Sequence, residues 1–260
     1  MASASGSGTK HAPVIFYGHG AGKPFREFSN FYPSDFKIED ITYWCMEQWI
    51  MAEKARLFGD SKTLTKILAS KRAGAIKTLG RKVKSFVEVK WAAARPDVAL
   101  TGLAAKFGQS KQLKELLLST GDALIVEAAE DDAIWGVGLS VKDAKSASPE
   151  TQDRWSKDGT NLLGRSLCMV REQIRASQPF TITVIGPRNG RGGDAQEYKA
   201  NPSDTIESIL GWARTNVYSC ADAAHVGSYD APALDGAQTV AGAGLSAGSI
   251  LRVRPKLVAT

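Results

Sequence analysis

The chain has 260 residues, of which 43% are hydrophobic, and a net charge of +6. Its three cysteines are far apart and odd in number, which excludes a disulfide framework, and its three histidines are too scattered for a zinc cluster. We therefore expect no metal and no cofactor. The first ten residues are polar, and no run approaches the length of a membrane span, so we expect an intracellular protein, cytoplasmic or nuclear, with no membrane contact.

The positive charge is concentrated in residues 1–179, which contain 26 basic and 20 acidic residues against seven of each in the remainder. The segment 62–90 alone has nine Lys or Arg residues and one acid, Glu88. Such a surface favours phosphate groups. A solvated basic helix face would have the same composition, and both interpretations remain open.

The small, polar residues 1–12 are expected to be disordered, and a short strand is expected at 14–17. The sequence GHGAGKPF follows this strand. We expect a flexible loop rather than a phosphate-binding loop, because proline follows the lysine and no helix begins there. A second short strand is expected at 35–38.

The segment 43–59, YWCMEQWIMAEKARLFG, has the pattern of one helix that ends at Gly59. Helical spacing puts Glu47 and Lys54 on the same apolar face, with Cα atoms roughly 10 Å apart, so their long side chains can converge on a bound molecule. Burial would lower the pKa of Lys54 and make its amine nucleophilic. Alternatively, the helix is structural and Lys54 extends past the apolar face to water.

The rest of the first half is predicted to be helical. One helix opens at Trp91 and has its true first turn at Pro96, and the others are expected at 61–69, 72–79 and 111–118. A buried strand is expected at 124–126, and Asp131 and Asp132 follow it closely in the sequence. The segment IWGVGL at 134–139 is typical of a loop that lets backbone approach a ligand, with structural turn glycines as the alternative.

The polar segment 140–158 is expected to be an exposed loop, and Asn161 to cap a helix at 162–176. We place a boundary at Pro179, between a first domain at 13–178 and a second at 179–256. The second domain combines a capped helix starting within 201–210 with a turn at 234–236, a glycine-rich hairpin turn at 186–193, and strands at 181–185, 196–200 and 249–254. This order is typical of a β-grasp domain. The whole chain is thus α+β, with a mostly helical first domain and a small sheet.

A series of short motifs runs through the first domain, each weak alone: FSNF at 28–31, Glu47 and Lys54, Lys77-x-x-Gly80-Arg81, Trp91, Lys106-Phe107-x-Gln109, Asp132-x-x-Trp135-Gly136-x-Gly138, Asn161-x-Leu163-Gly164 and Arg171. In this order and spacing, residues 14–176 resemble the NADAR family. One departure is plain, because the family usually carries histidine where this chain has Gln48. If that histidine assists proton transfer in relatives, it does not do so here.

The resemblance implies hydrolysis of an N-glycosidic bond. The favoured substrate is ADP-ribose attached to guanine in DNA or RNA, and the alternative is a phosphoribosylamino intermediate of riboflavin synthesis. A third hypothesis is a module that binds ADP-ribose or NAD without turnover, and the presence of both Glu47 and Lys54 argues against it.

On this basis we predict that Lys54 forms a Schiff base while Glu47 and Asp132 transfer protons. The alternative is direct attack of water with a carboxylate as base, in which Lys54 only neutralises a phosphate. Lys77 and Arg81 are expected to hold the diphosphate. The full set of predicted substrate-binding residues is Ser29, Asn30, Phe31, Lys77, Arg81, Trp91, Trp135, Gly136, Gly138 and Asn161.

The second domain resembles ubiquitin through PSDTIES at 202–208 and LDG at 234–236. The sequence ends in KLVAT without a Gly-Gly tail, so we expect no conjugation to targets. We therefore expect the second domain to dock a protein partner or to stabilise the first domain. The neutral charge of the second domain argues against contact with nucleic acid. We expect a monomer.

Overall fold

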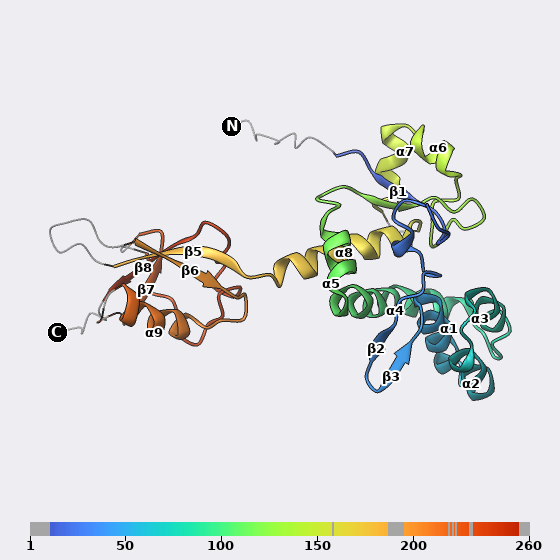
Figure 1. The fold of residues 1–260 in the computed structure, drawn as a ribbon, viewed down its shortest axis with the longest axis horizontal. Helices are drawn as coiled ribbons and strands as arrows, with labels where there is room; N and C mark the ends of the chain where they lie inside the picture. The colour runs from blue at the N-terminus through green and yellow to red at the C-terminus, as the bar shows by residue number, and fades with distance from the viewer. Residues whose placement is uncertain are drawn as a thin grey trace. The chain divides into compact units, whose positions relative to one another are not determined.

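The computed structural model describes residues 11–157, 159–186, 195–217, 219, 221, 223–228 and 231–254. Three predictions therefore concern mainly undescribed residues: the disorder of residues 1–12, the hairpin turn at 186–193, and the KLVAT terminus. The chain divides into two compact units, Met1–Ile174 and Arg175–Thr260 (Figure 1). Within the described ranges, no helix is both long enough and apolar enough to cross a bilayer.

Two small sheets organise the first unit. Strand β1 (Val14–Phe16) pairs in parallel with β4 (Ile125–Glu127), and β2 (Phe36–Ile38) forms an antiparallel pair with β3 (Ile41–Tyr43). Because β1 and β4 are parallel, the chain leaves both strands at the same edge. The segments that follow these strands are therefore neighbours, although they are far apart in sequence.

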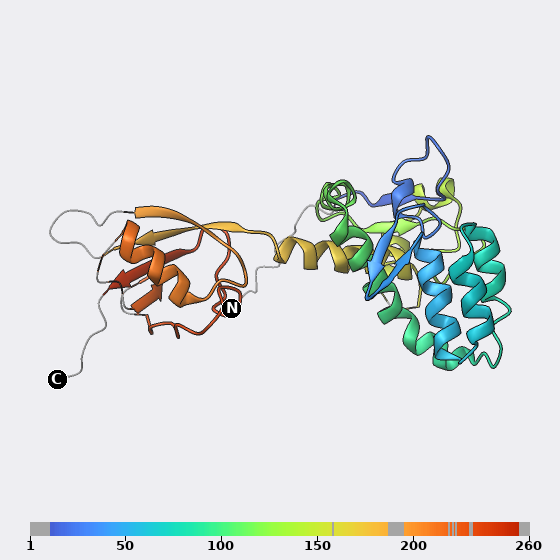
Figure 2. The same ribbon diagram turned by 60° about the horizontal axis from the view of Figure 1, so that its bottom comes forward.

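Helix α1 (Met46–Leu57) is the centre of a helical layer and contacts three other helices: α2 (Ser61–Ala69), α3 (Ala73–Gly80) and α4 (Glu88–Gln109). Figure 2 shows α1 and its neighbours side by side, and α5 (Lys111–Leu118) packs on α4. The side chain of Asp60 caps α2 by accepting a hydrogen bond from the amide of Thr63.

Helix α4 corrects one prediction. It begins at Glu88 and runs without a break through Pro96, so Pro96 does not mark a first turn. Proline within a helix removes one backbone hydrogen bond and costs about 3 kcal/mol. The buried side chains of Trp91 and Leu103, one on each side of Pro96, hold both halves of the helix against the core.

The segment 140–158 also differs from the predicted loop. Ser140 and Ser148 accept backbone hydrogen bonds as N-caps of two short helices, α6 (Val141–Lys145) and α7 (Pro149–Arg154). These helices bring Ala144 and Trp155 into a small core beneath β4. The polar composition here belongs to short, largely exposed helices and their two capping serines, which sequence patterning alone does not separate from a loop.

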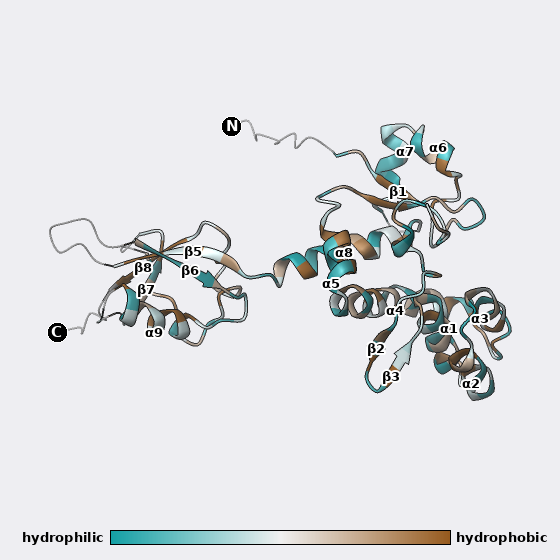
Figure 3. Ribbon diagram, in the orientation of Figure 1, coloured by the Kyte–Doolittle hydropathy of each residue, from teal (hydrophilic) through white to brown (hydrophobic). Residues whose placement is uncertain are grey.

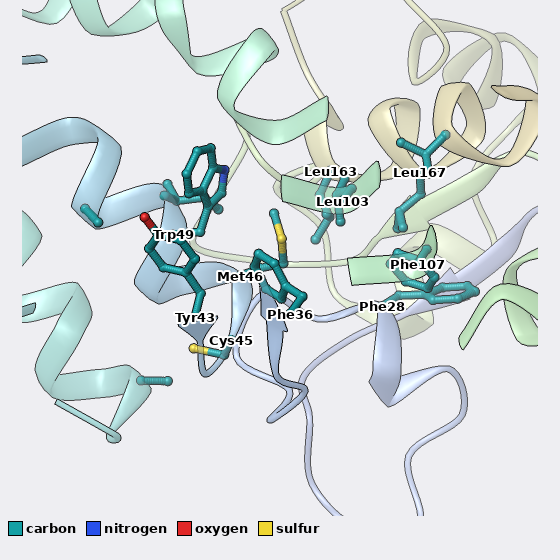
Figure 4. Packing of buried hydrophobic residues seen from close by; sticks show 14 of the residues in the cluster. Phe28, Phe36, Tyr43, Cys45, Met46, Trp49, Leu103, Phe107, Leu163 and Leu167 are labelled. Carbon is teal, nitrogen blue, oxygen red and sulfur yellow. The ribbon is translucent and has the colours of Figure 1, made fainter. Parts of the chain in front are cut away.

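The main core lies between the helical layer and α8 (Leu162–Ala176). Figure 4 shows Leu163 and Leu167 of α8 facing Phe107 and Phe28, and the rings of Phe28 and Phe107 meet edge to face at 5.8 Å. Apolar and polar bands alternate along α8 in Figure 3, as expected of a helix with one buried face.

The second unit contains one mixed sheet in the order β6-β5-β8-β7. Its strands are β5 (Phe180–Ile185), β6 (Ala195–Ala200), β7 (Ala223–Val226) and β8 (Ile250–Arg254). Strands β5 and β8 pair in parallel, whereas the outer pairs are antiparallel. Helix α9 (Ile206–Asn216) begins with Thr205 as its cap and buries Ile206, Ile209 and Leu210 in the same core as the sheet.

Candidate functional site

A cavity of about 680 Å³ opens in the first unit at the edge where β1 and β4 end. Five segments line it: the loop after β1, the loop at 29–31, one face of α1, the end of α3, and the loop after β4. The lining residues are Tyr17, Gly18, His19, Gly20, Lys23, Ser29, Asn30, Phe31, Glu47, Met51, Lys77, Arg81, Glu127, Ala129, Asp131, Asp132 and Trp135.

Two buried contacts fix the loop at 29–31 against the helices. The fully buried Lys106 of α4 donates hydrogen bonds from Nζ to the carbonyl oxygens of Glu27 at 2.6 Å and Ser29 at 3.2 Å. The amide of Glu47 donates to the carbonyl of Asn30 at 2.8 Å. Burial lowers the pKa of Lys106 to about 7. The position of this loop is therefore set by α1 and α4 together.

Glu47 lies in the first turn of α1 and is 5% exposed. Its Oε1 atom is buried and has no hydrogen-bond partner among the described residues. Burial raises the pKa of Glu47 to about 7, and the positive charge of Lys77 is the largest opposing influence. A carboxyl group with this pKa can both donate and accept a proton near neutral pH.

Glu127, at the end of β4, is a second such carboxyl, and it was not among the predicted site residues. Burial raises its pKa to about 8, and the negative charge of Asp132 adds to the rise. The sequence signal was an acid that ends a buried strand directly before an acidic loop. The sequence predicts that strand at 124–126, one residue short of Glu127.

Lys77 and Arg81 supply two of the cationic groups of the cavity. They are four residues apart at the end of α3 and so lie on one side of it. The ammonium of Lys77 lies 5.6 Å from the centre of the Phe31 ring, which also lines the cavity. One wall thus combines positive charge with an aromatic face.

Lys54 does not line the cavity. Its Nζ lies 4.0 Å from the ring centre of Phe86 and 5.9 Å from that of Trp91, and burial lowers the pKa of this ammonium. Met51, one turn after Glu47, occupies the cavity-facing position. The helix face shared by Glu47 and Lys54 therefore leaves the cavity before it reaches Lys54.

Asp132 and Trp135, both predicted, line the cavity. One carboxylate oxygen of Asp132, Oδ1, accepts hydrogen bonds from the amides of Ile134 at 3.0 Å and Trp135 at 2.9 Å. This oxygen shapes the loop after β4, and the other oxygen is not used in these bonds. Asp132 thus has a structural contact that the sequence did not indicate.

Four predicted binding residues lie outside the lining. Trp91 is 4% exposed and belongs to the main core. Asn161 is fully buried, and its amide bonds to the backbone of Glu127 at 3.1 Å and Ile125 at 2.9 Å, which fixes β4. A Cβ at Gly136 would lie 2.6 Å from the carbonyl oxygen of Glu127, and Gly138 has a φ of 67°. These residues position the site rather than form its surface.

The glycine-rich segment after β1, predicted to be a flexible loop, contributes five lining residues. Gly18 adopts a φ of 72°, which favours glycine, and His19 lies 5.7 Å from Phe31, ring centre to ring centre. The glycine-rich composition of this segment is visible in the sequence. In the described residues that follow directly, however, no α-helix begins, as a phosphate-binding loop would require. Its place at the cavity depends on the distant pairing with β4.

Gln48, which stands where the resemblance predicts histidine, points away from the cavity. Its amide nitrogen donates to the carbonyls of Ile67, Leu68 and Ser70, and its amide oxygen accepts from the amide of Trp44 at 2.7 Å. Gln48 therefore holds α1 to the end of α2. In the part of the chain that the structure describes, no group of three or more His, Cys, Asp or Glu side chains could hold a metal ion.

Comparison with known proteins gives a consistent result for the first unit. The NADAR domain matches residues 15–175, which is more than half of the chain. The N-glycosidase R617 of Acanthamoeba polyphaga mimivirus is 39% identical over 167 residues, covering 61% of this chain and 95% of its own length. The N-glycosidase Npun_R5314 of Nostoc punctiforme is 30% identical over 163 residues, covering 62% and 94%.

A third relative is larger than the matched region. The riboflavin biosynthesis protein VVA0006 of Vibrio vulnificus is 28% identical over 170 residues, which covers 65% of this chain and 41% of that protein. The match to the NADAR domain ends at residue 175, where the second unit begins.

Proposed function

Because the chain belongs to the NADAR family, we propose that it removes ADP-ribose from guanine bases of nucleic acid. Two relatives that are named N-glycosidases align with this chain over nearly the whole of their own length, so the chain is an enzyme of this class. The observation that carries the proposal is one cavity lined both by two carboxyls of raised pKa, Glu47 and Glu127, and by the cations Lys77 and Arg81. Cleaving a sugar–nitrogen bond requires proton transfer, and a diphosphate requires positive charge.

The two carboxyls suit different steps of this cleavage. A protonated Glu127 or Glu47 can donate its proton to the departing base, and the resulting carboxylate can then take a proton from an attacking water. The raised pKa of both groups keeps a proton available near neutral pH. Asp132 has an unshared carboxylate oxygen in the same cavity and could assist.

If the reaction is covalent, the lining favours Lys77 over Lys54 as its amine. The ring oxygen would take a proton as the ribose opens, which leaves an imine between the anomeric carbon and guanine. The Lys77 amine adds to that carbon, the guanine amine leaves with a proton from a carboxyl, and water then hydrolyses the lysine imine. The same residues would otherwise assist direct attack of water, with Lys77 neutralising phosphate.

The size and walls of the cavity support a nucleotide-like substrate. Its volume of about 680 Å³ lies within the range of small-molecule sites. Phe31 and Trp135 offer aromatic surfaces on which a base can stack. The basic segment 62–90 extends beyond Lys77 and Arg81, as expected if the substrate is part of a nucleic acid. The similarity to the riboflavin biosynthesis protein keeps a phosphoribosylamino substrate as the alternative.

The experiment is incubation of the protein with an oligonucleotide carrying ADP-ribosylated guanine and, separately, with phosphoribosylamino intermediates. Release of ADP-ribose supports the proposal, and hydrolysis of only the second substrates supports the alternative. Binding of ADP-ribose without release from either substrate would make the protein a binding module.

Borohydride added during turnover tests the covalent step. An imine on Lys77 would be reduced to an adduct one ADP-ribose heavier, and Lys77→Arg would be inactive because it keeps the charge but not the nucleophile. Lys54→Arg is the matched control, and it should remain active. An adduct on Lys54 would instead restore our prediction from the sequence.

For the second unit we propose a ubiquitin-like β-grasp fold that docks a protein partner. The strand order β6-β5-β8-β7, with a parallel central pair and a helix packed in the same core, supports this assignment. An experimental structure of residues 179–256 alone would test the fold. A partner should bind this segment as tightly as it binds the whole chain.

A further inference from the structure

Two buried oxygen atoms in the cavity are without partners. Asn30 Oδ1 and Glu47 Oε1 have no hydrogen-bond donor among the described residues, and the two residues are only 7% and 5% exposed. Both residues line the cavity. Most buried polar atoms in proteins are hydrogen-bonded, and leaving one unpaired costs free energy. Two such atoms in the lining of one cavity indicate that a ligand supplies the missing donors.

The two residues are joined through their backbones. The amide of Glu47 donates to the carbonyl of Asn30 at 2.8 Å, so the two side chains leave adjacent backbone positions. This backbone contact is itself fixed, because Lys106 holds the preceding carbonyl of Ser29. The backbone from which both side chains start is therefore held in place beside the cavity.

The chemistry of the cavity limits what these donors can be. Phosphate groups and base carbonyls are acceptors at neutral pH and cannot satisfy another acceptor. A ligand ammonium is disfavoured, because Lys77 and Arg81 already bring positive charge to the cavity. Amino and ring N–H groups of a base also donate, but hydroxyl groups on adjacent carbons of the ribose are donors that both proposed substrate classes share, and each hydroxyl donates one hydrogen bond.

We propose that Asn30 and Glu47 bind the two adjacent hydroxyls of the ribose whose bond to nitrogen is cleaved, and so select ribose over deoxyribose. This inference rests on the proposed function and adds which atoms of the substrate the cavity recognises. One oxygen of Glu47 holds a hydroxyl, and the other remains for proton transfer. The hydroxyl contact also fixes the sugar with its anomeric carbon near the carboxyls.

The test compares ribose 5-phosphate with 2-deoxyribose 5-phosphate and 3-deoxyribose 5-phosphate by isothermal titration calorimetry on the full chain. These probes contain the part shared by both substrate classes, and none requires turnover. Loss of a hydroxyl that bonds a buried acceptor is expected to weaken binding by roughly 10- to 100-fold.

Asn30→Ala and Glu47→Met each remove one acceptor. Each variant should reduce the discrimination against one of the two deoxy sugars to near unity, while the other deoxy sugar is still rejected. Ser34→Ala is the matched control, because Ser34 Oγ is also a buried oxygen without a partner but does not line the cavity. Its discrimination should equal that of the unaltered protein. Thermal unfolding of each variant verifies that it is folded.

Equal affinity for ribose and deoxyribose 5-phosphates would overturn the inference, as would discrimination that survives in both cavity variants. Failure of ribose 5-phosphate to bind at millimolar concentration would overturn it as well. These outcomes are separate from those of the proposed function. Release of ADP-ribose from guanine with no preference for ribose would leave the glycosidase proposal intact, and a clear preference without that release would leave the diol site intact.

Discussion

Replacing Glu47 by glutamine is expected to stabilise the protein, and to do so only at neutral and alkaline pH. Burial raises the pKa of Glu47 from 4.5 to about 7. Below pH 4.5 the group is protonated in both folded and unfolded chains and has no effect. Between pH 4.5 and 7 the unfolded chain loses the proton while the folded protein keeps it, so the free energy of unfolding falls as pH rises.

The size of the effect follows from the same shift. At 1.36 kcal/mol per pKa unit, the charged form of Glu47 reduces the free energy of unfolding by roughly 3 kcal/mol above pH 7. Glutamine is neutral at every pH and has nearly the same shape. The difference between the variant and the unaltered protein should therefore grow from near zero at pH 4.5 to roughly 3 kcal/mol at pH 8.

Urea unfolding at pH 5 and pH 8, followed by tryptophan fluorescence, measures this difference. Five of the six tryptophans lie in the first unit, so the signal reports mainly on it. Glu115→Gln is the control, since Glu115 is exposed on α5 and should show no such dependence. A Glu47→Gln variant that gains no stability between pH 5 and pH 8 would refute the argument that this carboxyl is buried at a cost.

Three further outcomes are expected. Gln48→Ala removes four hydrogen bonds that join α1 to α2 and to Trp44, and should lower the free energy of unfolding by about 2–4 kcal/mol in the same urea experiment while KM is unchanged. Gly80→Ala places a methyl group against the side chain of Met51, which lines the cavity, so KM should rise. The double variant Gly80→Ala with Met51→Ala should regain the original KM. An unchanged KM for Gly80→Ala would mean that Met51 moves away from the cavity. A chain ending after Ser177 should stay folded by circular dichroism and active on small substrates, and aggregation or inactivity would show that the two units depend on each other.

The helical layer was largely predictable because its apolar periodicity is strong. Helices at 61–69 and 111–118 agree with α2 and α5, since each has a cap and a clear apolar face. Weaker signals failed. Strand β7 has only four residues, two of which are alanine, a weak strand former, and it was not predicted. Pro96 indicated a helix start that the packing of α4 overrides.

For the candidate site, too, local sequence patterns predicted some residues and missed others. The motifs supplied Glu47, Lys77, Arg81 and Asp132, all of which line the cavity. Helical periodicity assigned Lys54 to the face of Glu47 but could not tell how far along α1 the cavity extends. Glu127 was missed because the strand was predicted to end at residue 126, and because only the pairing of β1 with β4 places the end of that strand at the cavity.

That pairing also determines when activity can arise during folding. The register joins Val14 to Ile125, residues more than a hundred positions apart, whereas the contacts among α1, α2 and α3 are local. Contacts close in sequence form fast and distant ones form late. The helical layer can therefore appear without a working cavity, and hydrolysis should begin only when the β1–β4 pair closes. Activity regained on refolding should therefore lag behind the helical circular dichroism signal, so that activity reports the closing of the β1–β4 pair rather than the formation of the helices.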